Sequence, residues 1–152
     1  MDLALFQPDI AGNVGTTLRT AACFGAAAHI VEPCGFPFSD GALKRAGMDY
    51  AVRANVRRHA DWDAFRAWSA AAGRRIVLLT TAGATPLPAF AFTPADMLLF
   101  GSESSGVPAH VHAAADARVA IPMRPGFRSL NVAVAAGIAL AEALRQTKGF
   151  AS

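Results

Sequence analysis

The sequence predicts an α/β protein in which a mostly parallel central sheet is flanked by helices. Short apolar segments of strand length alternate along the chain with segments whose apolar residues recur at helical spacing, a pattern typical of βαβ units. No linker, repeat or low-complexity tract divides the 152 residues, so we expect one domain over 1–152. The expected strands are 3–6, 29–31, 75–80, 96–100 and 118–121.

Helices are expected between these strands, and several have recognisable ends. Val14 and Leu18 lie four residues apart on the first helix, which Gly25 ends. Asp61 is placed to cap a helix over 62–72, and Gly73 follows that helix. Shorter helices are expected at 39–46 and 110–115, and extended chain is expected within 50–56.

The last helix, expected to begin around Leu130-Asn131, is apolar on nearly every face. Small residues along it allow another backbone to approach closely, and its predicted core stripe comprises Leu130, Val134, Ile138 and Leu144. Because such a helix cannot face water, we expect its own sheet to cover one side and a second copy of the protein to cover the other. This pattern therefore predicts a homodimer.

The composition argues against a membrane protein and against a metal centre. Hydrophobic residues make up 53% of the chain, but no uninterrupted apolar run approaches the roughly 18 residues of a membrane span. No secretory signal is recognisable, so a cytoplasmic location is expected. Cys23 and Cys34 have no second cysteine pair at zinc-ligand spacing; both are expected to be reduced thiols, with Cys23 packed in a helix.

The net charge of +3 is unevenly distributed. Five basic residues occur against one acid, Asp49, between positions 41 and 58: Lys44, Arg45, Arg53, Arg57 and Arg58. Such a cluster forms either a phosphate-facing patch or a solvated face, and charge alone does not separate the two. The four histidines match no catalytic motif and are expected to be surface or packing residues: His29, His59, His110 and His112.

Three loops follow expected strands at 8–19, 101–108 and 122–131. In a parallel sheet these loops meet at one edge, where open α/β sheets bind their ligands. Gly101 and Gly106 permit a tight turn around Glu103, although alone this loop is hard to tell from a plain turn. The loops contain neither the dinucleotide-binding fingerprint nor a Walker phosphate loop.

Taken together, the three loops resemble the SPOUT superfamily of RNA methyltransferases. The matching positions are Asn13, Gly15 and Arg19, then Gly101, Glu103 and Gly106-Val107-Pro108, and finally Ile121-Pro122-Met123 with Ser129-Leu130-Asn131. Within the superfamily, the segments 32–36, 44–50, 79–81 and 142–146 resemble the TrmL group, which methylates the ribose 2′-oxygen of cytidine or uridine at the wobble position of tRNA.

The resemblance implies the α/β-knot (SPOUT) fold, in which the last segment threads a loop to make a C-terminal trefoil knot. It also implies S-adenosyl-L-methionine as cofactor, bound at Leu79, Thr80, Gly101, Glu103, Ile121, Met123, Ser129 and Leu130. The implied catalytic residues are Arg19, Asn13, Ser129 and Asn131, and the implied RNA contacts are Lys44, Arg45, Arg124 and Arg128. The resemblance further implies a homodimer joined through the last and first helices, with tRNA as its partner and no metal ion.

Several roles stay open at this point. Arginine is a poor base, with a pKa above about 12, so Arg19 is expected to hold a phosphate and polarise the 2′-hydroxyl. Glu103 either pairs with Arg19 or stabilises a helix end, and Asn13 either orders its loop or contacts the ribose. The chain departs from the family pattern at Ala11, Phe127 and Ala141, and the last of these replaces a tyrosine that offers an aromatic contact.

Three alternatives are weighed against this function. The first is an enzyme of the same fold that modifies another tRNA or rRNA nucleotide. The second is a non-catalytic RNA-binding dimer, which the intact Arg19, Glu103 and Ser129-Leu130-Asn131 disfavour. The third is an open Rossmann methyltransferase for small molecules, but residues 8–12 are a poor version of its glycine-rich first loop.

Overall fold

The computed structural model describes residues 1–45, 54–82 and 84–152. Some sequence predictions fall outside these ranges: residue 46 of the helix expected at 39–46, residues 46–50 of the segment 44–50, Asp49 and Arg53 of the charged cluster, and residues 50–53 of the expected extended chain. The side chain of Lys44 is also outside the described part. Within the described ranges, no helix is long and apolar enough to cross a membrane.

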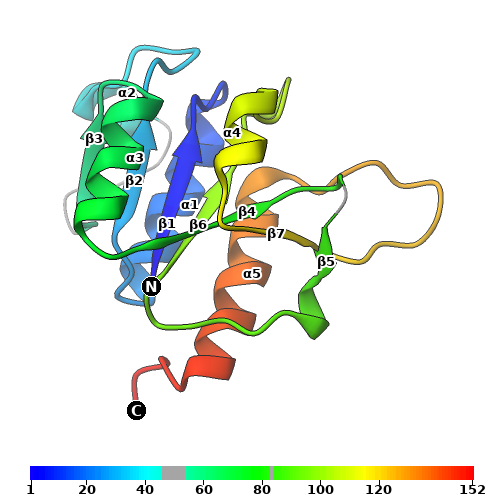
Figure 1. The fold of residues 1–152 in the computed structure, drawn as a ribbon. Helices are drawn as coiled ribbons and strands as arrows, with labels where there is room; N and C mark the ends of the chain where they lie inside the picture. Colours follow the sequence, from blue (N-terminus) through cyan, green and yellow to red (C-terminus); the bar gives the residue numbers. More distant parts are fainter. Residues whose placement is uncertain (46–53, 83) are drawn as a thin grey trace.

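Seven strands in the described part of the chain form one parallel sheet, in the order β3-β2-β1-β6-β4-β7-β5 (Figure 1). The strands are β1 (Asp2–Phe6), β2 (Ala28–Val31), β3 (Val56–His59), β4 (Arg75–Leu79), β5 (Thr85–Pro86), β6 (Asp96–Phe100) and β7 (Ala117–Ala120). The helices are α1 (Ala11–Cys23), α2 (Asp40–Arg45), α3 (Trp62–Ala71), α4 (Ala109–Ala114) and α5 (Val132–Thr147), with a 3₁₀ turn η1 (Leu87–Ala89). The predicted α/β class with a parallel sheet is confirmed.

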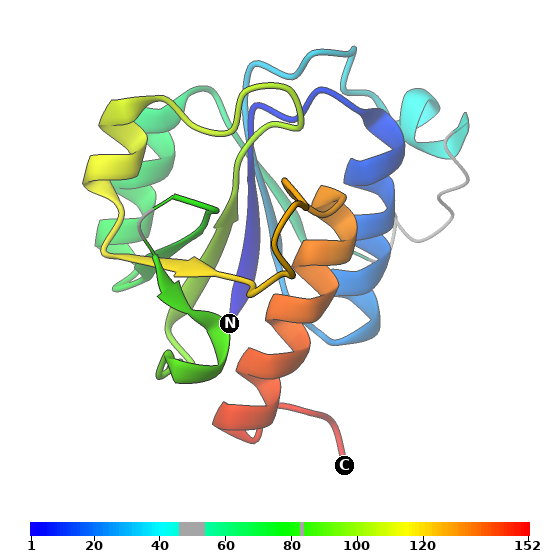
Figure 2. The ribbon, with the colours of Figure 1, turned by 90° about the vertical axis from the view of Figure 1, so that its right-hand side faces the viewer.

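Helices cover both faces of the sheet (Figure 2). Helices α1 and α5 pack on one face, and α3 and α4 pack on the other. Strand β1 shows why both faces are apolar, because Leu3 and Leu5 point toward α1 and α5 while Ala4 and Phe6 point toward α3 and α4. A strand buried on both sides is expected to be continuously apolar, as the segment 3–6 is.

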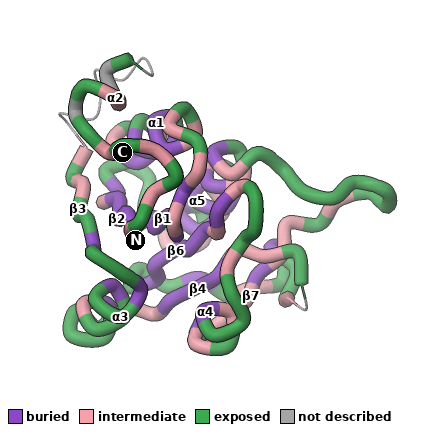
Figure 3. Tube along the Cα trace, turned by 90° about the horizontal axis from the view of Figure 1, so that it is seen from above, coloured by how far each residue is buried: buried purple, intermediate pink, exposed green. Residues whose placement is uncertain are grey.

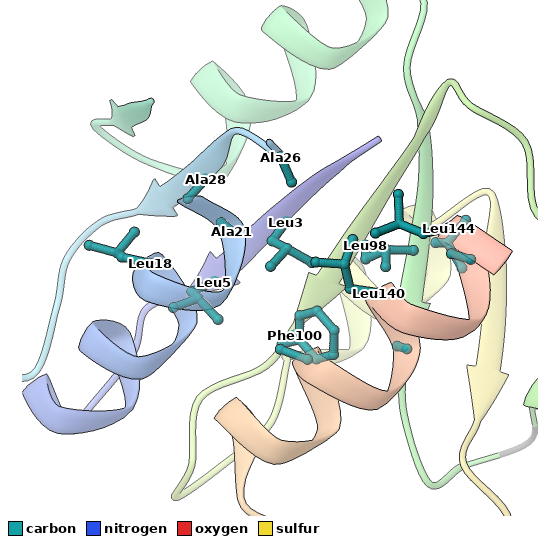
Figure 4. Packing of buried hydrophobic residues seen from close by; sticks show 14 of the residues in the cluster. Leu3, Leu5, Leu18, Ala21, Ala26, Ala28, Leu98, Phe100, Leu140 and Leu144 are labelled. Carbon is teal, nitrogen blue, oxygen red and sulfur yellow. The ribbon is translucent and has the colours of Figure 1, made fainter. Parts of the chain in front are cut away.

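The core beneath α5 joins elements from opposite ends of the sequence (Figure 4). Leu3 of β1 and Leu98 of β6 are paired neighbours in the sheet, and both are fully buried near Leu140 of α5. Burying one such leucine contributes about 1.5–3 kcal/mol relative to leaving it exposed. This packing holds the second half of α5 against the face of the sheet.

Helix α5 packs through its small residues rather than through the predicted stripe. Its buried face contains Ala133, Ala136, Ala139, Leu140, Ala143 and Leu144. Leu130, Val134 and Ile138 are instead 38%, 51% and 40% exposed, so the predicted core stripe is correct only for Leu144. The alanine face allows a close approach to the sheet and α1, and this turns the bulky residues outward.

Other boundaries also differ from expectation. Strand β5 and the turn η1 lie in the proline-containing connection between β4 and β6, where the sequence predicted neither, because a two-residue edge strand containing Pro86 has no strand-like sequence pattern. Strand β7 ends at Ala120, so Ile121 belongs to the following loop. Cys23 ends α1 with an exposed side chain, which overturns its predicted packing.

Two of the histidines form a buried pair between β2 and β3. His29 Nδ1 and His59 Nε2 lie 2.9 Å apart, and both rings pack against Phe65 and Trp68 of α3. The packing role expected for these two histidines is confirmed. Burial, followed by the electrostatic influence of the neighbouring His29 and Arg57, lowers the pKa of His59 to about 4.

This depressed pKa predicts acid sensitivity. The unfolded chain takes up a proton on His59 below about pH 6.5, whereas the folded protein resists it down to about pH 4. As the pH is lowered from about 6.5 to about 4, the free energy of unfolding is therefore expected to fall by at most about 3 kcal/mol. Urea unfolding at several pH values measures the slope. His59→Phe, which keeps an aromatic ring against α3, should show a shallower slope, and an unchanged slope would contradict the assignment.

Candidate functional site

A pocket of about 700 Å³ lies at the carboxyl edge of the sheet. Its lining comes from 10–13, 78–82, 100–107 and 121–135, together with His112 of α4. These stretches follow β1, β4, β6 and β7, and their convergence at one edge is the consequence of parallel pairing. The three loops singled out in the sequence therefore meet, and the loop after β4 completes the wall. A pocket of this size suits a ligand of cofactor dimensions.

The loop after β6 is closed so tightly that its first position must be glycine. Ser102 and Gly106 exchange two backbone hydrogen bonds of 2.9 Å, and Gly106 has a φ of +63°. A Cβ on Gly101 would lie 2.5 Å from the carbonyl carbon of Gly106. No such contact is tolerated without moving backbone, so the loop's shape depends on Gly101.

Glu103 links this loop to the start of α1. Its carboxylate accepts hydrogen bonds from the backbone N–H of Asp9 at 2.7 Å and from the side-chain amide of Asn13 at 3.1 Å. Helix α1 has no side-chain cap at Ile10 and no acidic residue in its first turn. Glu103 therefore supplies negative charge where the helix dipole favours it. Of the two roles left open by the sequence, this geometry favours the helix-end stabiliser.

Asn131 extends the same network to the last helix. Its amide nitrogen donates to the side-chain oxygen of Asn13 at 3.0 Å, and its own side-chain oxygen accepts from the backbone N–H of Ala133 at 2.9 Å. Asn131 is thus the N-cap of α5 and also a link to α1. The chain Glu103–Asn13–Asn131 joins all three loops across the mouth of the pocket.

A second contact fastens the loop after β1 to the loop after β6. Asp9 accepts hydrogen bonds from the hydroxyl and the backbone N–H of Ser104. The hydroxyl bond, followed by the backbone bond, lowers the pKa of the Asp9 carboxyl. Asp9 therefore holds the loops together as a carboxylate at neutral pH.

The structure brings most of the predicted site residues together. Every residue expected to contact the cofactor lines the pocket: Leu79, Thr80, Gly101, Glu103, Ile121, Met123, Ser129 and Leu130. Asn13 and Asn131 also line it. Leu79, Ile121 and Leu130 give it apolar wall, which fits the flat, apolar faces of an adenine ring, while Thr80 and Ser129 offer hydroxyl groups to a ribose or amino-acid portion. These residues fit S-adenosylmethionine.

Other predicted residues lie away from the pocket. Arg19 is exposed on α1 and is not among the lining residues of its own chain. Arg124 and Arg128 are exposed on the connection between β7 and α5, and Arg45 is exposed at the end of α2. Sequence reasoning did not identify His112 and Ala135 as pocket residues. Neither carried a signal, because His112 comes from a short helix without a motif and Ala135 from an alanine-rich one.

Outside the pocket, we considered the half-buried thiol of Cys34 and groups that could hold a metal ion within the described part of the chain. Burial, followed by the charge of Glu32, raises the pKa of the half-buried Cys34 to about 11, so it is a protonated thiol at neutral pH. Among the described residues, no group of three or more His, Cys, Asp or Glu side chains is arranged to hold a metal ion.

The parallel sheet and the pocket made by its carboxyl-edge loops define the class: an α/β protein with a cofactor-sized binding pocket at the carboxyl ends of its strands. Comparison with known families makes the assignment specific, since residues 1–141 match the SpoU rRNA Methylase family. The chain belongs to this family of S-adenosylmethionine-dependent methyltransferases.

Individual relatives are similar over nearly the whole chain. A tRNA (cytidine(34)-2'-O)-methyltransferase of Ancylobacter novellus is 58% identical over 149 residues, covering 98% of this chain and 94% of that protein. A solved structure described as giving insights into the 2-OH methylation of C/U34 on tRNA is 41% identical, with a TM-score of 0.90, covering 97% of this chain and 96% of the other. An AdoMet-bound rRNA methyltransferase from Sinorhizobium meliloti is 34% identical, with a TM-score of 0.84, covering 94% and 55% respectively.

Proposed function

We propose that this protein transfers a methyl group from S-adenosylmethionine to the ribose 2′-oxygen of the wobble nucleotide of tRNA, either cytidine or a modified uridine. One observation carries the proposal: the eight cofactor positions converge on one pocket beside the Asn13–Asn131 link. Relatives whose names or descriptions state this reaction are 58% and 41% identical to the chain over nearly its whole length, and this similarity supports the choice of nucleotide. We expect the protein to act in the cytoplasm, as one domain spanning 1–152.

The pocket residues are proposed to position the cofactor. Leu79, Ile121 and Leu130 would hold its adenine, and backbone groups of the loop at Gly101 would read the ring edge. S-adenosylmethionine supplies a methyl group on a cationic sulfur, so the leaving group needs no metal or acid. The protein's own work is to align the ribose 2′-hydroxyl and to stabilise negative charge that develops on its oxygen.

The polar residues at the mouth of the pocket are proposed to hold the ribose. Asn13 and Asn131 fix each other, so the amide groups that remain free for substrate are pre-oriented. Ser129 adds a hydroxyl beside them. Arg19 would hold the phosphate next to the reacting ribose and polarise its 2′-hydroxyl, because a guanidinium stays charged and binds phosphate in a fork.

We further propose that the active unit is a homodimer joined through α5 and α1. Val134 and Ile138 support this, since they form an apolar face on α5 that is exposed in a single chain. A dimer also accounts for Arg19, which lies outside its own pocket and would reach that of the second copy. The family resemblance and the passage of Ser129-Leu130-Asn131 beside the loops at 79–82 and 101–106 support a trefoil knot at this point.

The arginines on the loop before α5 are proposed to bind RNA phosphates, together with Lys44 and Arg45. Binding through phosphates releases counterions, so the logarithm of RNA affinity should fall linearly with the logarithm of salt concentration. Arg124→Gln and Arg128→Gln are each expected to reduce the steepness of this line by about one ion. Filter binding of tRNA between low and moderate salt measures the slope. An affinity that is independent of salt would remove these residues from the interface.

The chemical part of the proposal is tested with matched anticodon stem-loops. One carries an ordinary wobble cytidine, and its control carries a 2′-deoxycytidine there and is otherwise identical. Labelled methyl groups should pass to the first RNA and not to the second, because only the first offers a 2′-hydroxyl at that position. Equal labelling of both RNAs would show that another nucleotide is the target. Cofactor binding without transfer to any RNA would favour a non-catalytic RNA-binding dimer.

A further inference from the structure

The most exposed large apolar side chain in the described part of the protein is Phe127, at 73%. It lies on the connection between β7 and α5, which projects from the body of the molecule and is exposed along most of its length (Figure 3). An aromatic residue left this exposed buries little of its surface in the fold. The exposure of Phe127 therefore indicates that the ring contacts a partner outside the single chain.

A tight turn presents the ring. The backbone N–H of Phe127 donates to the carbonyl oxygen of Arg124 at 3.4 Å, and Pro125 and Gly126 occupy the two central positions. The φ of Gly126 is +94°, which together with the preceding proline is typical of a type II turn. Proline and the turn restrict the backbone, so little freedom is lost when Phe127 meets its partner.

The charge around the ring identifies the chemistry of that partner. Arg124 and Arg128 flank Phe127, and the sequence contains no acidic residue from Ala117 to Ala141. An exposed aromatic ring between two arginines provides a stacking surface with phosphate-binding groups on both sides, the combination that recognises single-stranded nucleic acid. A symmetric contact of this loop with its own copy would instead place arginines against arginines.

The loop returns directly to the pocket. Ser129 and Leu130 line it, and the two residues from Phe127 to Ser129 span at most about 7 Å. The ring therefore reaches a nucleotide next to the one whose ribose enters the pocket. We propose that Phe127 is a base-stacking residue that positions the RNA by binding an unpaired base adjacent to the methylated nucleotide. This inference rests on the proposed RNA 2′-O-methyl transfer.

The test combines a protein change with an RNA change, both read by equilibrium binding without methyl transfer. Phe127→Ala should weaken binding of the anticodon stem-loop about tenfold. Phe127→Tyr should restore it, because tyrosine stacks as well. Each nucleotide that flanks the target is also replaced, one at a time, by an abasic residue. At one of these two positions the replacement should weaken binding to the unaltered protein about as much as Phe127→Ala does. With that abasic RNA, Phe127→Ala should cost no further affinity, since the stacked base is already missing.

Controls separate this result from a folding or assembly defect. Phe127→Ala should retain the cofactor affinity and oligomeric state of the unaltered protein, and Phe150→Ala, which removes another exposed ring, should leave RNA binding unchanged. Equal RNA affinity of Phe127→Ala and the unaltered protein would overturn the proposal. The proposal would also be overturned if the loss of affinity from Phe127→Ala added fully to the loss from the abasic residue at both flanking positions. A change in the oligomeric state of Phe127→Ala would overturn it too, because the ring would then contact the second copy. Failure of the proposed function is distinct, because the unaltered protein would then transfer no methyl group to a wobble ribose.

Discussion

Arg19→Ala is expected to lower the rate of methyl transfer by about 10²- to 10³-fold, with cofactor affinity and dimerisation unchanged. The expected loss is that of removing one group that stabilises charge in the transition state. Cofactor binding should survive because Arg19 does not line the pocket of its own chain. Single-turnover transfer to tRNA and calorimetric titration with S-adenosylmethionine measure the two quantities separately. Equal loss of both would make Arg19 a structural residue instead.

The same change tests whether Arg19 acts on the partner's pocket. Arg19→Ala has an intact pocket, whereas a variant with a damaged pocket still has Arg19. If Arg19 acts across the interface, a mixed dimer of the two regains one complete site. Because half of randomly paired dimers are mixed, an equimolar mixture should recover about a quarter of the normal activity. A mixture as inactive as its components would place Arg19 in its own chain's site.

Gly101→Ala is expected to supply such a damaged pocket. The new Cβ would lie 2.5 Å from the carbonyl carbon and 2.7 Å from the Cα of Gly106, so the two backbones must separate. Separation breaks the paired hydrogen bonds between Ser102 and Gly106 and displaces Glu103. We expect cofactor binding to be lost and the free energy of unfolding to fall by about 1–3 kcal/mol. Calorimetry and thermal unfolding measure these effects.

Gly12→Ala is the matched control for this substitution. A Cβ on Gly12 meets nothing within 4 Å, and the residue lies in the first turn of α1. The change should therefore leave cofactor binding intact and stabilise the fold slightly, since alanine favours helix over glycine. Normal cofactor affinity in Gly101→Ala would show that the loop adapts, and it would contradict the tight closure.

Local sequence patterns were enough to predict the parallel sheet and the place of the pocket, although not the strands β3 and β5. Strand β6 is continuously apolar from Met97 to Phe100 because both faces are covered, and parallel pairing then brings the following loops to one edge. The motif residues Gly101, Ile121 and Ser129 consequently meet although they are far apart in the chain. Neither periodicity nor spacing indicated the cofactor. That expectation came from the resemblance of the combined loops to a known superfamily.

What the sequence could not give depends on contacts between distant elements. The periodicity of α5 fits either face, and only packing against α1 and the sheet shows that Ala136 is buried and Val134 exposed. The network through Glu103 has the same character, because its partners Asp9 and Asn13 are 94 and 90 positions away in the chain. Phe127 stood out in the sequence only as a departure from the family pattern, and its exposure and turn are properties of the folded loop.

On the proposed function, the pocket at the carboxyl edge directs methyl transfer to the wobble ribose. Its most direct test is nucleoside and fragment mass analysis of tRNA that lacks wobble ribose methylation, after reaction with the protein and S-adenosylmethionine. We expect 2′-O-methylcytidine or a 2′-O-methylated uridine at the wobble position, and neither with Gly101→Ala. A methyl group on a base, or on a ribose elsewhere in the tRNA, would contradict it.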